Sequence, residues 1–205
     1  MIRDYLKSNY LKLIYDAMEK VPRDYQRIGC AGTNKPVYRE RVYCYELYHQ
    51  MRLLQKSRAK TLKNNRPGPL VINGEIDKRG HMLIGPDYNP DFVIHEQGSM
   101  EHNHCVIEVK TTLDAKGVKK DLKTISSLIS KYNYDYGVLI IIGSACEEVK
   151  ETITSLLLPT CLDKKCAHNI FLFIQPTISD PGNIHICIER LSDWPINYNR
   201  SKYNV

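Results

Sequence analysis

Residues 89–112 constrain this chain most, because they place ionisable side chains within strands that otherwise consist of apolar residues. The segment contains two short runs of strand-forming residues, Phe-Val-Ile and Cys-Val-Ile-Glu-Val, joined by a polar connection over residues 96–104 that we expect to be exposed. Asp91 precedes the first run, while Glu108 and Lys110 stand two residues apart in and after the second. Side chains alternate across a strand, so Glu108 and Lys110 project from the same face. A hairpin of the two strands would bring Asp91 beside them.

This grouping of charges is costly for a purely structural element. Val106, Ile107 and Val109 indicate that the second strand is central and buried, where unpaired charges are disfavoured. Each charged residue alone has a structural alternative, because a Pro-Asp pair is common in turns and Glu-x-Lys suits the solvent face of an edge strand. Two carboxylates and one ammonium group together are expected where a cation or a reaction requires them. We therefore interpret the three residues as a candidate active site.

The spacing of apolar residues along the rest of the chain predicts an α/β domain. We predict helices over residues 2–21, 37–63, 114–132 and 147–158. Besides the two central strands, we predict strands over residues 70–74, 136–143, 170–174 and 184–190, with a turn and a short return strand over residues 75–85. Strand, helix and strand around the helix at 114–132 form a crossover unit, which places those two strands side by side and parallel.

The chain has 205 residues, which is the length of one ordinary domain. We expect a single domain over residues 1–205, with a core over about 37–143. An amphipathic N-terminal helix within residues 1–22 and a peripheral helix and strands over 144–195 would complete it. A hydrophobic content of 42% with 25% charged residues is typical of folded globular proteins and argues against a disordered chain.

Charge and cysteine content indicate which partners and which cellular compartment to expect. The net charge of +6 favours an anionic partner. Seven cysteines without paired spacing are not the pattern of a secreted disulfide framework. The first residues lack the apolar run of a signal peptide, and the longest apolar run, residues 137–143, is too short to span a bilayer. We expect a cytoplasmic protein without membrane contact.

A glutamate on a helix, Pro90-Asp91 on one strand, Glu108-Val109-Lys110 on the paired strand, and then a helix and a buried strand resemble the PD-(D/E)XK nuclease superfamily. The resemblance covers roughly residues 37–143. It implies the restriction-endonuclease-like fold, in which a mixed central sheet is flanked by helices. It also implies a divalent-metal-dependent hydrolase of DNA phosphodiester bonds, such as a restriction or defence endonuclease, that leaves a 5′-phosphate and a 3′-hydroxyl.

The chemistry of phosphodiester hydrolysis explains these residue types. The reaction requires charge neutralisation at the phosphate and an available nucleophile. Mg²⁺, for which Mn²⁺ can substitute, provides both. It binds to oxygen ligands such as carboxylates. The resemblance assigns Asp91, Glu108 and the carbonyl of Val109 as metal ligands. Lys110 would orient or deprotonate the attacking water, or stabilise charge on the phosphate.

The family also draws an acidic residue from the helix before the core sheet. Glu46 is our candidate for this residue, either as a catalytic residue or as a metal ligand. Glu40 on the same predicted helix and Glu75 after the first strand remain open alternatives. Asp77 lies in a stretch whose composition is that of a turn.

Partners follow from the same resemblance. Lys119, Lys120 and Lys123 would contact DNA phosphates, although a solvated helix face explains them equally simply. Cutting both strands in one encounter needs two active sites, which favours a homodimer, and target specificity would come from the peripheral segments or from a partner protein. The alternative function is a nuclease-fold module without catalysis that binds nucleic acid or assembles a larger complex, against which the intact Asp91, Glu108 and Lys110 argue.

Overall fold

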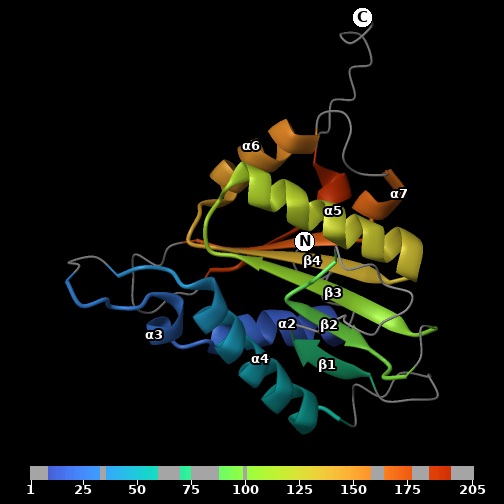
Figure 1. Ribbon diagram of the computed structural model, residues 1–205, viewed down its shortest axis with the longest axis horizontal. Helices are drawn as coiled ribbons and strands as arrows, with labels where there is room; N and C mark the ends of the chain where they lie inside the picture. The colour runs from blue at the N-terminus through green and yellow to red at the C-terminus, as the bar shows by residue number, and fades with distance from the viewer. Residues whose placement is uncertain are drawn as a thin grey trace, which may run out of the picture.

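The computed structural model describes residues 9–32, 36–59, 70–74, 88–98, 101–157, 164–176 and 185–194 (Figure 1). Within these residues the chain forms an α/β architecture, with one open, mixed six-stranded sheet between two layers of helices. The predicted α/β class with a mixed sheet flanked by helices is therefore confirmed.

Among the described helices, none combines the length and apolar character needed to cross a membrane.

The strands follow one another across the sheet in chain order. They are β1 Val71–Gly74, β2 Phe92–His95, β3 Asn103–Lys110, β4 Tyr136–Ile142, β5 Ile170–Gln175 and β6 Cys187–Arg190. The first three form an antiparallel meander, β3, β4 and β5 are parallel, and β6 returns antiparallel to β5. The predicted parallel pairing of the strands on either side of the helix at 114–132 is confirmed.

The helices divide between the two faces of the sheet. They are α2 Asn9–Lys20, α3 Arg23–Gln26, α4 Glu40–Ser57, α5 Ala115–Tyr132, α6 Cys146–Leu157 and α7 Lys164–Ala167, with a 3₁₀ turn, η1, over Leu191–Asp193. Figure 1 shows α2 and α4 on one face and α5 and α6 on the other. The four predicted long helices all form, whereas α3, α7 and η1 are too short to carry a periodic pattern. Residues 1–8, 60–69 and 75–87, with the turn and strand predicted there, lie outside the described residues.

Alternation of side chains sorts the sheet residues between the two helical layers. On β3, Cys105, Ile107 and Val109 join the core formed with α2 and α4. Val106 joins the core formed with α5 and α6. Glu108 projects from the same side of β3 as Val106, so it faces α5. It lies near the carboxyl end of β3, from which the chain leads into α5.

Helix α5 packs closely on the sheet and has defined ends. Asp114 caps its start, because its carboxylate accepts hydrogen bonds from the backbone N–H groups of Lys116 and Gly117. Asn133 ends it in the left-handed conformation with a φ of 55°. A methyl group at Gly137 on β4 would collide with Ile125 of α5, so the close approach of helix and strand requires glycine there.

The start of β3 differs from the sequence prediction. We expected residues 96–104 to be an exposed polar connection, but Asn103 and His104 belong to β3 and are only 2% and 8% exposed. Their burial follows from specific partners. The side-chain amide of Asn103 donates to the carbonyl of Tyr132 over 2.7 Å, and Nδ1 of His104 lies 2.8 Å from Oδ2 of Asp135. Polar residues therefore fix the start of β3 to the end of α5.

A disulfide joins Cys146 at the start of α6 to Cys187 on β6. The two cysteines are 41 residues apart in the chain, so their proximity depends on the tertiary fold and is not visible in the spacing of cysteines.

Candidate active site

The meander brings the predicted carboxylates together at one end of β3. Phe92 pairs with Ile107 across β2 and β3, and continuing this register by one residue sets Asp91 opposite Glu108. The backbone N–H of Val109 donates to Oδ2 of Asp91 over 2.7 Å. The backbone N–H of Asp91 donates in turn to the carboxylate of Glu108. Each acid is thus oriented by the backbone of the other strand.

The ionised form of both carboxyl groups is disfavoured at this position. The pKa of Asp91 is raised to about 6, chiefly by burial and also by nearby Glu40 and Asp121, against the opposing effects of the Val109 N–H and Lys110. Glu108 is only 5% exposed. Burial, followed by the charges of Asp121 and Asp91, holds its pKa well above the usual range. The site therefore favours an added positive charge next to this pair.

Lys110 connects the two helical layers beside the acids. Its Nζ lies 3.1 Å from Oδ2 of Asp121 on α5 and 3.4 Å from Oε2 of Glu40 on α4. Burial lowers the pKa of Lys110, but Asp121, Glu40 and Asp91 together outweigh burial and raise it. The side chain consequently remains an ammonium group near neutral pH.

The sequence analysis did not select Asp121, which the structure places in this cluster. Its carboxylate is 5% exposed, and burial raises its pKa while Lys110 lowers it. Its buried Oδ2 lies against Lys110 and has no further hydrogen-bond partner among the described residues. A signal for Asp121 was present, because it follows Val118 by three residues and precedes Ile125 by four, which places an acid on the apolar stripe of the helix.

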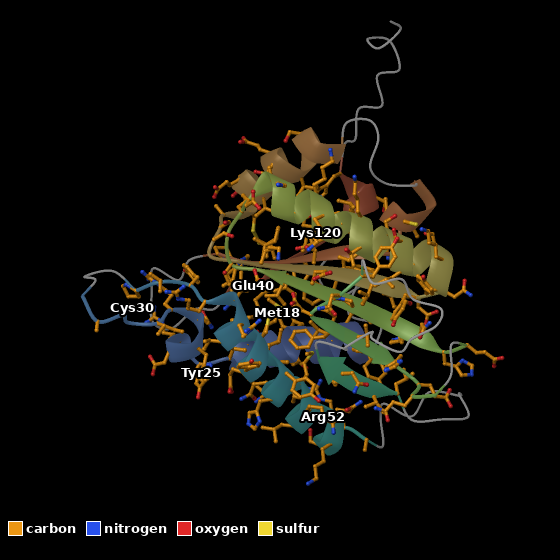
Figure 2. All side chains as sticks on the ribbon, viewed as in Figure 1. Met18, Tyr25, Cys30, Glu40, Arg52 and Lys120 are labelled. Atoms are coloured by element: carbon orange, nitrogen blue, oxygen red, sulfur yellow. A yellow bond between two sulfur atoms is a disulfide. The ribbon has the colours of Figure 1, made fainter. Side chains whose placement is uncertain are left out.

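From helix α4, the structure brings Glu40 rather than Glu46 to Lys110. Glu40 is the first residue of α4, and Figure 2 shows it where that helix approaches the sheet. Glu46 lies six residues later, or about 9 Å further along the axis. Its Oε1 accepts a hydrogen bond from Nε2 of Gln50 over 2.7 Å, one helical turn away. Glu75 lies outside the described residues.

The donor set suits Mg²⁺ in its chemistry. Mg²⁺ commonly binds one or two carboxylates and keeps several waters, and Asp91 with Glu108 supplies two such groups. The backbone N–H of Val109 contacts the Asp91 carboxylate, and the carbonyl oxygen of Val109 remains a predicted metal ligand. Among the described residues, no three or more histidine, cysteine, aspartate or glutamate side chains are arranged to hold an ion by themselves. Water or substrate oxygens would have to complete the coordination.

The predicted DNA-binding lysines line a cavity next to this cluster. Lys119, Lys120 and Lys123 lie along one side of α5 in a cavity of about 510 Å³ that also includes Lys116 and Tyr88. The charge of Lys120 lowers the pKa of Asp121, so the cavity and the acidic cluster lie within electrostatic reach of each other. Figure 2 shows Lys120 on α5.

The chain matches no protein-family model, no curated protein and no solved structure.

Proposed function

We propose that this chain is a divalent-metal-dependent nuclease that hydrolyses DNA phosphodiester bonds and has the restriction-endonuclease-like fold. The observation that carries the proposal is the pair of Asp91 and Glu108, set opposite each other by the register of β2 and β3, with the Asp91 carboxylate held by the Val109 N–H and Lys110 on the same face of β3 as Glu108. The succession of α4, the β1–β3 meander, α5 and parallel β4 supports it, because these elements occur in the order that the resemblance implies.

The residues divide the chemical work as follows. Mg²⁺, when bound, would supply charge neutralisation at the phosphate and would lower the pKa of water. Asp91 and Glu108 would hold the ion, and the Val109 N–H keeps the Asp91 carboxylate aligned. Lys110 remains protonated, so it would donate a hydrogen bond to the attacking water or to a phosphate oxygen rather than accept a proton.

Glu40 and Asp121 act on Lys110 from opposite sides of the sheet. Their carboxylates contact Nζ from α4 and α5, which limits the directions in which the ammonium can point. This arrangement gives both acids a positioning role in the proposed reaction. Glu40, rather than Glu46, is thus the proposed contribution of α4 to the site, acting as a positioning residue for Lys110.

The second candidate function is a nuclease-fold module that binds nucleic acid or assembles a complex without catalysis. It is favoured by the same two ion pairs, because they offer Lys110 a purely structural role. The two functions differ in whether the acids are needed for chemistry or only for folding.

A cleavage assay separates the two functions. The protein is incubated with supercoiled, linear and single-stranded DNA and with RNA, in Mg²⁺, Mn²⁺ or EDTA, beside Asp91→Ala and Lys110→Ala. Glu148→Gln and Lys56→Ala, which alter exposed residues on α6 and α4, are matched controls. We expect metal-dependent cleavage that falls by at least about 100-fold in the two site variants and is unchanged in the controls. Cleavage that survives in both site variants or in EDTA would refute the mechanism, and binding without any cleavage would favour the module.

A further inference from the structure

A cationic groove on α5 lies next to the candidate active site. Its cavity of about 510 Å³ is lined by four lysines, three serine or threonine residues and one tyrosine: Lys116, Lys119, Lys120, Lys123, Thr124, Ser126, Ser127 and Tyr88. The lining contains four ammonium groups and no carboxylate, so it attracts an anion strongly. We refer to this cavity as the α5 groove.

The α5 groove and the acidic cluster share two segments of chain. Lys120 is next to Asp121 in the chain, and both belong to α5. Tyr88 precedes Asp91 by three residues, a distance that an extended chain covers in about 10 Å. A strand of nucleic acid with one phosphate at Asp91 would therefore have its neighbouring nucleotides within reach of the groove.

Tyr88 introduces an aromatic surface into a wall that is otherwise cationic and hydroxylic. Its hydroxyl accepts a hydrogen bond from Nζ of Lys131 over 3.3 Å. Its ring meets the ring of Tyr132 edge-on, with centroids 6.3 Å apart and an interplanar angle of 71°. These contacts orient the ring, and an aromatic side chain beside a positively charged groove is the arrangement on which unpaired bases stack.

We propose that the α5 groove binds an unpaired stretch of nucleic acid, with phosphates on its lysines and one base stacked on Tyr88. The inference rests on the proposed nuclease function and specifies its substrate class. Base pairing and stacking in a duplex hide the faces of the bases, so only an unpaired base gains from Tyr88. The cavity has a volume of about 510 Å³. Small-molecule sites span roughly 300–1,000 Å³, so the groove has room for a group the size of one nucleotide.

Binding in EDTA tests the groove apart from cleavage. Fluorescence anisotropy compares a labelled single strand with the corresponding blunt-ended two-strand duplex for wild type, Tyr88→Leu, Tyr88→Phe and the double variant Lys119→Ala/Lys123→Ala. Tyr45→Leu on α4, whose side chain is 63% exposed, is the matched aromatic control, and Lys56→Ala is the matched lysine control. We expect tighter binding of the single strand than of the duplex by wild type.

The variants should divide by mechanism. Tyr88→Leu should weaken single-strand binding by about 5- to 100-fold without affecting duplex binding, and Tyr88→Phe, which keeps the ring, should retain single-strand binding. The double lysine variant should weaken binding of both forms and reduce the slope of log affinity against log salt by about 1–2. Thermal melting of each variant identifies any that fails to fold, in which case Tyr88→Phe and the lysine variant decide the outcome.

The outcomes distinguish this inference from the proposed function. Equal affinity for duplex and single strand, absence of binding to both at low salt, or single-strand affinity unchanged in folded Tyr88→Leu would overturn the inference. The expected binding pattern in a protein that cleaves nothing would support the groove and refute the nuclease. Metal-dependent cleavage with a Tyr88→Leu variant of unchanged affinity would do the reverse.

Discussion

Replacing Asp91 with asparagine should stabilise the folded chain at alkaline pH and have little effect in acid. Asparagine keeps a side-chain oxygen that can accept the hydrogen bond from the Val109 N–H, but it removes the charge. The pKa of Asp91 is raised from 3.8 to about 6 in the folded state. The folded chain therefore binds this proton more tightly than the unfolded chain, and its stability falls as pH rises from about 4 through about 6.

The magnitude follows from the size of the shift. A rise of about two pKa units at 1.36 kcal/mol each corresponds to an upper limit of about 3 kcal/mol. Asp91 is only half-buried, so water reaches the carboxylate and reduces its cost. We expect Asp91→Asn to gain about 1–2 kcal/mol above pH 7, which for a chain of this length raises Tm by about 2–8 °C.

Thermal unfolding followed by far-ultraviolet circular dichroism in EDTA measures this effect at about pH 8 and about pH 4.5. Asp193→Asn, a change at an exposed carboxylate, is the matched control for the loss of one carboxyl group. Mg²⁺ added at pH 8 should raise the Tm of wild type more than that of Asp91→Asn, because the variant lacks one proposed ligand. An equal change in Tm at both pH values, or a loss of stability at pH 8, would refute the electrostatic reasoning.

Three further predictions concern other residues of the site and the sheet. Lys110→Met removes the cation between Glu40 and Asp121, so it should cost about 2–4 kcal/mol at pH 8 and less at pH 5, because the raised pKa of Asp121 favours its uptake of a proton; urea denaturation beside Lys56→Met measures this, and equal losses in both variants would contradict it. Glu40→Gln should slow cleavage by about 10- to 100-fold and Glu46→Gln should not, whereas the opposite ranking in a cleavage assay would restore Glu46 as the acid from α4. Gly137→Ala should cost about 1–3 kcal/mol because its methyl group meets Ile125; a thermal melt equal to that of Gly29→Ala, which has open space around its Cβ position, would show that α5 can shift.

The proximity of Asp91, Glu108 and Lys110 was predictable because it depends on local rules. A strand sets the shared face of Glu108 and Lys110, and the antiparallel pairing of β2 with β3 brings Asp91 opposite Glu108. The apolar neighbours on β3 also indicated its burial correctly, since Val106, Ile107 and Val109 are fully buried.

The choice of the remaining acids depends on tertiary geometry that the sequence does not specify. Glu46 satisfied the pattern of a glutamate near the buried face of a helix, but the crossing of α4 over the sheet brings its first residue, Glu40, to Lys110. Asp121 depends on how α5 is rotated about its axis, and its neighbours Lys119, Lys120 and Lys123 directed attention to the exposed side of that helix. The burial of His104 likewise depends on its contact with Asp135, which lies 31 residues away in the chain.

The alternation of side chains along β3 also determines which changes in chain length the protein can tolerate. Deleting one residue within β3 before Ile107 would turn Glu108 and Lys110 towards the core formed with α2 and α4, and would turn Ile107 and Val109 towards α5. Two ionisable groups would then replace apolar ones in the larger core, and the proposed site would lose its acid and its ammonium group together. Insertions and deletions among descendants of this sequence should therefore accumulate in surface connections and be eliminated from β3.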